Sequence, residues 1–373
     1  MFGNKRFIKQ VMITFKELNK KNKISDIELG SISLLNAKSL YDVFKTDKNI
    51  LHLFYNGSYD FTSIDVIFEL MEYDKVILDF SGADDFLLRF YDMDNVKSKI
   101  KAKEIIIISK NIFEKPGYIY NDPIMHRIKI LDFIITNDIK NHLYFFLGGH
   151  ARWHRLLFLN KLLKINALSK LNWSLRRVEE EIPSMVRSCI PLEYINLYKD
   201  LEIHKYLPKS LDFDIHNQAE YHNFGDASIF NNPGYVANLD FYYNSYIEII
   251  SESVFELAIN PAKKDKEYFI VSEKTFKPLA LGFPFIGLTL PKTFAKLKEW
   301  GFKLFDELID YSFDDEYDDN KRMDIIIEQI CNTNIKENFN IHFESIKEKH
   351  LHNRKMFLEL KERLLKNYEK NII

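Results

Sequence analysis

Short, strongly apolar segments alternate along the chain with longer segments whose apolar residues recur at helical spacing. This alternation is typical of parallel sheets flanked by helices. An unbroken run of isoleucines at 105–108 indicates a strand that is buried on both faces. The pattern predicts one α/β domain over residues 1–140, with a helix at 64–73 and strands at 49–55, 75–80, 104–109 and 127–136.

A second α/β domain is expected over residues 141–335. The pattern predicts helices at 151–164 and 275–281 and strands at 142–147, 268–271 and 283–288, with a strand or a strand and helix start at 246–258. Residues 212–233 are rich in Asn, Asp, His and Gly, and we expect a loop region there. Charged helices are expected from residue 335 onward, so that residues 336–373 form a helical tail that packs back on the domains.

The composition supports a folded chain of two ordinary domains, since 46% of the 373 residues are hydrophobic. Lysine and arginine number 52 against 54 acids, which gives a net charge of -2. We expect no membrane span, because no apolar run reaches the roughly 18 residues that a bilayer requires. The first ten residues do not resemble a secretory signal, and Cys189 and Cys331 have neither metal-ligand nor disulfide spacing. These features favour a cytoplasmic location.

Only 12 residues are glycine, and neither a G-x-G-x-x-G nor a G-x-x-x-x-G-K-[ST] pattern occurs. This excludes the usual glycine-rich phosphate loops. A bound phosphate would have to be held by a helix N-terminus and positive side chains. Five glycines fall at expected strand–helix junctions, namely Gly57, Gly82, Gly148, Gly149 and Gly282.

The segment 271–278 places Glu273 and Lys274 side by side where an expected strand is followed by a helix. This is the carboxyl edge of a parallel sheet, where ligands usually bind. A carboxylate there can accept hydrogen bonds from a ribose diol, and an ammonium can contact a diphosphate. Either Ser272 or Thr275 can cap the helix, and the second choice puts Pro278 in the first turn. Alternatively, the glutamate only complements the helix dipole beside a solvated lysine.

The segment 148–155 contains two glycines at a strand end, and these let the backbone turn sharply before a helix. The start of that helix offers N–H groups to an anion. Arg152 and Arg155 are three residues apart, near His154, and are expected to share a helix face. Seven basic residues and no acid occupy 151–177, and for Lys161, Lys164 and Lys170 a solvated helix face is the preferred interpretation.

The segment S-E-K-T-F-K-P-L-A-L-G-F-P-F-I at 272–286 resembles the donor-binding motif of GT-B glycosyltransferases of the fucosyltransferase and exostosin type. The resemblance implies that Glu273 contacts the nucleotide ribose and Lys274 the phosphates, with Ser272 and Thr275 beside them. The segment 147–163 is similar to the start of the second domain in fucosyltransferases. That similarity implies a phosphate ligand at Arg155, with Arg152 close by.

The stretch S-E-S-V-F at 251–255 precedes the Glu-Lys motif as a polar strand end does in that family, which places Glu252 near the base or sugar of the donor. Together with R-W-H-R and the segment 301–306, these motifs resemble uncharacterised glycosyltransferase-like proteins of phage and environmental viral genomes. The resemblance covers about the second half of the chain. The chain lacks the full signature of fucosyltransferases, which combines an aromatic residue with Glu, Asn and Ser.

The resemblance implies a GT-B-like fold, in which two Rossmann-like domains face each other across a cleft. The enzyme would move a hexose or pentose from a nucleoside-diphosphate sugar to a hydroxyl group, with no metal and no cofactor. The acceptor would be a saccharide or a hydroxymethylated base in phage DNA. The near-zero net charge, however, offers no broad electrostatic footprint for duplex DNA. Candidates for the general base are Asp60, Asp84 and Asp85, although each is also a typical turn or cap residue.

Two other interpretations stay open. A non-catalytic, GT-B-shaped binding or scaffold protein would keep the fold without the activity. A metal-dependent enzyme would use a D-x-D pair, either Asp92 and Asp94 or Asp212 and Asp214. The eight acids in 306–319 are interpreted as a solvated helix flank. The aromatic residues Trp153, Trp173, Tyr242 and Tyr243 are interpreted mainly as core, with stacking on a base or sugar as the alternative.

Overall fold

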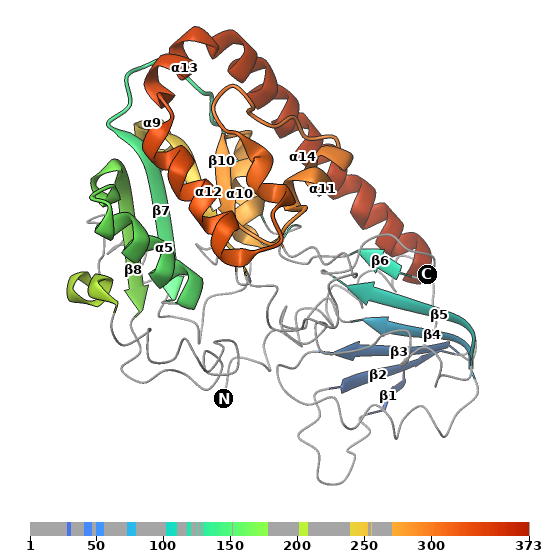
Figure 1. Cartoon of the computed structure of the whole chain (residues 1–373). Coiled ribbons are helices and arrows are strands. Elements are labelled where there is room, and N and C mark those ends of the chain that lie inside the picture. The colour runs from blue at the N-terminus through green and yellow to red at the C-terminus, as the bar shows by residue number, and fades with distance from the viewer. Residues whose placement is uncertain are drawn as a thin grey trace. The chain divides into compact units, whose positions relative to one another are not determined.

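The fold of the chain is seen in a computed structural model (Figure 1). The described residues are 28–30, 41–46, 50–55, 73–79, 102–109, 118–120, 125, 128, 130–150, 152–177, 201–207, 239–252, 255 and 271–372. The chain divides into two compact units, one of residues 1–126, 224–231 and 361–373 and one of residues 127–223 and 232–360. The domain limits expected from the sequence, 140/141 and 335/336, stay predictions.

The first unit contains a six-stranded sheet whose strands follow one another in chain order. These are β1 (Glu28–Gly30), β2 (Tyr41–Thr46), β3 (Ile50–Tyr55), β4 (Tyr73–Asp79), β5 (Ala102–Ser109) and β6 (Tyr118–Tyr120). The first three strands pair antiparallel, whereas β3 to β6 pair parallel. The strands expected at 49–55, 75–80 and 104–109 are confirmed. In β5, Ile106 and Ile108 are buried, whereas Ile105 on the opposite face is only half-buried. The helix expected at 64–73 lies outside the described residues.

The prediction of a strand at 127–136 is wrong, because the described residues 130–141 form no strand. Phe133 and Ile135 are buried, so the apolar pattern reflects packing. The carbonyl groups of Leu131 and Phe133 accept hydrogen bonds from the side chain of Arg354 and therefore have no need of a neighbouring strand.

The second unit contains a four-stranded sheet in the order β10-β9-β7-β8, and all its pairs are parallel. The strands are β7 (His142–His150), β8 (Leu171–Arg177), β9 (Ser245–Ser251) and β10 (Phe285–Leu288). Three of them confirm predicted strands, and β8 was not predicted. Of the strand expected at 268–271, only Val271 is described, and it lies outside any strand.

The sharp turn expected at Gly148 and Gly149 is also wrong, since β7 continues through both glycines to His150. Gly148 packs closely against β8. A Cβ atom on it would come within 2.5 Å of Leu175 Cδ1 and 3.1 Å of the Ser174 carbonyl oxygen.

Helices cover both faces of the parallel sheet. They are α5 (Trp153–Lys164), α9 (Leu239–Asn244), α10 (Glu273–Leu281), α11 (Thr293–Glu299), α12 (Asp319–Asn332), α13 (Ile335–Ile341) and α14 (Phe343–Ile372), with short 3-10 helices η2 (Leu168–Lys170), η3 (Glu202–Tyr206) and η7 (Tyr311–Asp315). Helix α12 packs against α5, where Lys161 pairs with Asp324 at 2.5 Å. Helix α10 packs against α14 through the rings of Phe276 and Phe357. The predicted C-terminal helices are confirmed.

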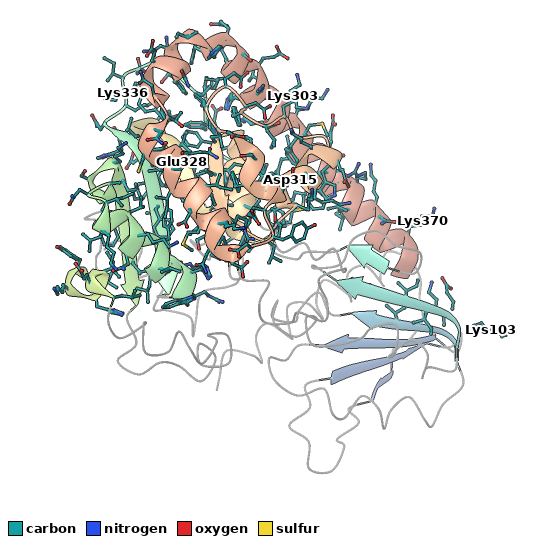
Figure 2. The ribbon with its side chains drawn as sticks, viewed as in Figure 1. Lys103, Lys303, Asp315, Glu328, Lys336 and Lys370 are labelled. Atoms are coloured by element: carbon teal, nitrogen blue, oxygen red, sulfur yellow. The ribbon has the colours of Figure 1, made fainter. Side chains whose placement is uncertain are left out.

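The acidic run 306–319 is only partly a solvated flank. Asp314 is buried, and its carboxylate accepts hydrogen bonds from the backbone N–H groups of Phe294 (3.0 Å) and Ala295 (2.8 Å) in the first turn of α11. Asp318 caps α12 by accepting from the Lys321 N–H. Beyond this run, the side chains of Glu328 on α12 and Lys336 on α13 are exposed (Figure 2). No helix in the described part of the chain combines the length and apolar character that crossing a bilayer requires.

Candidate functional site

The order of the strands in the second unit creates a topological switch point between β7 and β9. From β7 the chain passes through α5 to β8 on one side, whereas from β9 it passes through α10 to β10 on the other. Because such crossovers are right-handed, α5 and α10 lie on opposite faces of the sheet. In open α/β sheets, ligands bind outside the carboxyl ends of the strands at such a point. The end of β9 is therefore the candidate ligand site of this unit.

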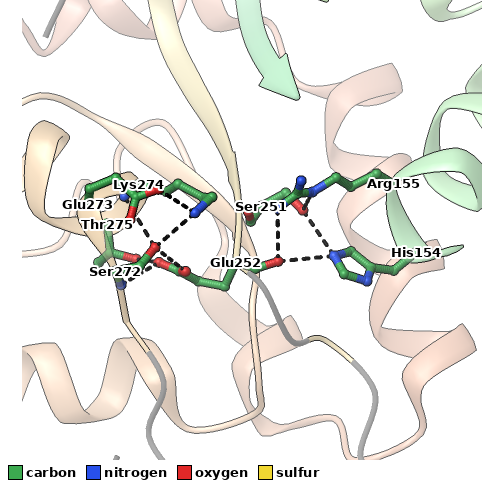
Figure 3. Close-up of polar contacts among 8 residues, drawn as sticks. All are labelled: His154, Arg155, Ser251, Glu252, Ser272, Glu273, Lys274 and Thr275. Carbon is green, nitrogen blue, oxygen red and sulfur yellow. Dashed lines mark hydrogen bonds and ion pairs between the residues drawn. The ribbon is translucent and has the colours of Figure 1, made fainter. Parts of the chain in front are cut away.

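Two consecutive residues at this end contact different helices, because successive side chains of a strand point to opposite faces of the sheet. Ser251 is directed to α5 and Glu252 to α10 (Figure 3). Both residues are buried, with Glu252 at 0% exposure. The Glu252 N–H extends the ladder by donating to the Leu288 carbonyl at 3.1 Å. The side chain of Glu252 is thus fixed at the start of α10.

The Glu252 carboxylate accepts three hydrogen bonds from the first turn of α10. Oε1 accepts from the Ser272 N–H at 2.9 Å and from the Thr275 hydroxyl at 2.5 Å. Oε2 accepts from the Ser272 hydroxyl at 2.5 Å. Ser272 is the N-cap of α10, and its oxygen accepts from the Lys274 N–H. Of the two possible caps, the structure therefore has Ser272, and Pro278 lies in the second turn rather than in the first.

Glu273 and Lys274 form an ion pair at the start of α10, with Lys274 Nζ 2.5 Å from Glu273 Oε1. Lys274 Nζ also lies 3.2 Å from Ser272 Oγ. Burial opposes ionisation of Glu273, but Lys274, Lys277 and the backbone N–H of Glu273 outweigh it and hold its pKa at about 2. The two side chains are 21% and 25% exposed, so the pair is only partly buried.

Arg155 and His154 come from the first turn of α5 and hold the end of β9 from the other face. Arg155 donates from Nε to Ser251 Oγ at 3.0 Å and from Nη2 to the Ser251 and Glu252 carbonyls at 2.9 and 3.3 Å. His154 Nε2 lies 3.2 Å from Ser251 Oγ and 3.1 Å from the Glu252 carbonyl oxygen. Both side chains are only 3% exposed. Arg155 and His154 are buried, and their helix face packs against β9.

A third helix, α12, contacts Phe255, which follows the end of β9 in the chain. The Arg322 guanidinium on α12 lies 4.3 Å from the centre of the Phe255 ring and donates to the Phe255 carbonyl at 2.6 Å. It also pairs with Asp319 at 2.6 Å. The ring of Phe255 in turn lies 5.7 Å from the ring of His154. The described residues of 251–255 are therefore held by α5, α10 and α12 together.

The structure brings most of the predicted donor-site residues to the end of β9 and the start of α10. These are Arg155, Glu252, Ser272, Glu273, Lys274 and Thr275. Arg152 is the residue before α5 and is half-buried. The base candidates Asp60, Asp84 and Asp85 and the pairs Asp92/Asp94 and Asp212/Asp214 lie outside the described residues. Among the described residues, no group of three His, Cys, Asp or Glu side chains could hold a metal ion.

Sequence reasoning missed the carboxyl group of Glu248, which lies under α10 in the middle of β9. Burial raises its pKa to about 7, against the effects of Lys277 and of the Tyr242 hydroxyl, which donates to Glu248 Oε2 at 2.8 Å. The signal was a single acid within the apolar run 246–250. Trp153, Trp173 and Tyr242 are buried, so they belong to the core, whereas Tyr243 is exposed.

Comparison of the chain with protein-family models and with curated proteins gave no match.

Proposed function

We propose that this chain is a GT-B-type glycosyltransferase that moves a sugar from a nucleoside-diphosphate sugar to a hydroxyl acceptor without a metal ion. The observation that carries the proposal is the Glu273–Lys274 pair at the first turn of α10, next to the carboxyl end of β9. A carboxylate, an ammonium and a helix N-terminus suit the ribose diol and the diphosphate of such a donor.

The ion pair must be exchanged when the donor binds. Lys274 would leave Glu273 for the phosphate oxygens, and Glu273 would accept hydrogen bonds from the ribose. After Lys274 moves, Lys277 and the backbone N–H of Glu273 still favour the ionised carboxylate, which can accept these bonds. In the transfer step, the acceptor hydroxyl attacks the anomeric carbon, the bond to the diphosphate breaks, and Lys274 stabilises the leaving negative charge.

Arg155 has a supporting role in this proposal. Its guanidinium is buried, and its bonds to the Ser251 and Glu252 carbonyls hold the strand end beside which the donor would lie. A general base from the first part of the chain would take the acceptor proton, and Asp60, Asp84 and Asp85 stay the candidates. The acceptor would be a saccharide or a hydroxymethylated DNA base.

Thermal unfolding with and without nucleotides tests the proposal. We expect UDP or GDP to raise the melting temperature of the wild-type chain and to raise that of Lys274→Ala by much less. Lys298→Ala is the matched control, because Lys298 is an exposed lysine on α11. If no common nucleoside diphosphate shifts the wild-type melting temperature, the proposal fails.

Slow hydrolysis of a nucleotide sugar in the absence of acceptor separates a transferase from a binding protein of the same fold. A transferase is expected to release the nucleotide slowly, and Lys274→Ala is expected to stop this release. The rate should be unchanged by a chelator. Loss of hydrolysis with chelator would instead favour a metal-dependent enzyme.

A further inference from the structure

The Ser272 hydroxyl connects the buried Glu252 carboxylate to the Lys274 ammonium. A hydroxyl group has one hydrogen, and at 2.5 Å from Glu252 Oε2 this hydrogen is donated to the carboxylate. The lone pairs of Ser272 Oγ therefore face the Lys274 N–H at 3.4 Å and the Lys274 ammonium at 3.2 Å. The direction of this hydroxyl, and with it the place of the ammonium, depends on Glu252.

Glu252 is itself held from the opposite face. Its carbonyl oxygen accepts from Arg155 Nη2 at 3.3 Å and lies 3.1 Å from His154 Nε2. Its N–H is bonded to Leu288 on β10. With both backbone groups bonded and the side chain fully buried, Glu252 cannot move without breaking several hydrogen bonds. It is a fixed point from which the first turn of α10 is oriented.

We propose that Glu252 is a positioning residue, which acts through the Ser272 hydroxyl to hold the Lys274 ammonium in place for an anionic ligand. The inference rests on the proposed function, because the anion is the diphosphate of the donor. Glu252 touches no ligand in this arrangement. Side chains that orient a ligand-binding group in this way contribute to affinity although they do not contact the ligand.

A double-mutant cycle on anion binding tests the inference. Calorimetry measures the affinity of UDP, GDP and inorganic pyrophosphate for the wild type, Glu252→Gln, Lys274→Ala and the double variant. In Glu252→Gln, the single amide oxygen is needed at the Oε1 position, where it accepts from the Ser272 N–H and the Thr275 hydroxyl. The amide NH2 then replaces Oε2 and cannot accept the Ser272 hydrogen, so the relay is broken. We expect about tenfold weaker binding in Glu252→Gln, since a hydrogen bond to a charged group contributes roughly 1.5 kcal/mol or more. In the Lys274→Ala background, the same change is expected to have no further effect.

The matched control is Asp314→Asn. Asp314 is another buried carboxylate that accepts from backbone N–H groups in the first turn of a helix, α11. Its substitution is expected to lower the melting temperature and to leave the anion affinities unchanged. If Glu252→Gln does not fold, Ser272→Ala removes the relay while keeping the carboxylate, and it should weaken binding by a similar factor.

Two results overturn the inference. One is unchanged anion affinity in Glu252→Gln or Ser272→Ala although the wild type binds, which leaves Glu252 with a purely structural role. The other is an equal loss of affinity with and without the Lys274 side chain. Absence of binding by the wild type overturns the proposed function itself, and the inference with it.

Discussion

Ser272 Oγ lies 2.5 Å from Glu252 Oε2, and the two residues are 20 positions apart in the chain. This contact joins the end of β9 to the N-cap of α10. It also brings two separate motifs, at 251–255 and at 272–278, into one cluster.

Substitution of Arg155 tests whether it supports the strand end or binds phosphate. We expect Arg155→Lys to lower the free energy of unfolding by about 2 kcal/mol, because at least one buried carbonyl loses its donor. Anion affinity, measured where the variant is folded, should change less than threefold. Urea denaturation and calorimetry give the two quantities. Lys164→Ala, at the exposed end of the same helix, is the control and should be close to neutral. A tenfold loss of affinity in Arg155→Lys with little loss of stability would make Arg155 a phosphate ligand.

Glu273 and Lys274 are expected to contact different parts of a donor. Glu273→Gln should weaken UDP or GDP binding by about tenfold, since the carboxylate accepts the ribose hydroxyls. Pyrophosphate binding should be unchanged or stronger, because Lys274 is released from its ion pair. Calorimetry with the nucleotides and with pyrophosphate makes the comparison. Equal losses for both ligands would contradict separate roles.

The pH dependence of stability should contain two opposing contributions. Burial lowers the pKa of His350 from 6.5 to about 4, so its contribution is present above pH 6.5 and is lost as the pH falls towards 4. Burial raises the pKa of Glu248 from 4.5 to about 7, so its contribution is present below pH 4.5 and is lost as the pH rises through 7. Between pH 4.5 and 6.5 the two slopes should largely cancel.

Two variants separate these contributions. Glu248→Gln should expose the slope of His350, with stability rising by up to about 1.4 kcal/mol per pH unit between pH 4.5 and 6.5 relative to the wild type. His350→Gln should expose the falling slope of Glu248. Urea denaturation across this range measures both. Parallel curves for all three proteins would contradict the assignment.

Gly282 ends α10 in the left-handed region, with φ of 62°. A Cβ atom on it would lie 2.2 Å from the His350 carbonyl oxygen on α14. We expect Gly282→Ala to cost about 3 kcal/mol, from the left-handed backbone and the clash with main-chain atoms. Gly301, with φ of 98°, is the control, because there the nearest atom is the end of the flexible Met356 side chain. Chemical denaturation should show a loss for Gly301→Ala that is smaller by about 2 kcal/mol.

Six of the ten described strands were predictable from the sequence. Apolar runs identified β3, β4, β5, β7, β9 and β10, because a buried strand must be apolar over most of its length. The same signal failed at 127–136, where apolar side chains are buried without a strand. It also missed the short strands β1 and β6 and the strand β2. It missed β8 as well, where apolar residues alternate with polar ones and two arginines end the strand.

The candidate site was predictable in its residue types and less so in its contacts. A strand followed by a Glu-Lys helix start indicated the ligand edge, and Ser272 was one of two possible caps. The sequence did not indicate that Arg155 is buried, because a basic residue in the first turn of a helix is usually expected to be exposed or to bind an anion. Glu252 was assigned to the donor, whereas its carboxylate is bonded to α10. Asp314 and Arg322 were likewise hidden within charged segments.

By itself, the sequence determined the α/β class, the helical C-terminus and the position of the Glu-Lys motif at a helix start. These features depend on local periodicity, capping and propensity, which neighbouring residues decide. The tertiary structure decided the strand order 10-9-7-8, the switch point between β7 and β9, and the opposite directions of Ser251 and Glu252. Those depend on which distant segments pair, and the energy of a buried polar group is set by the partner it meets after folding.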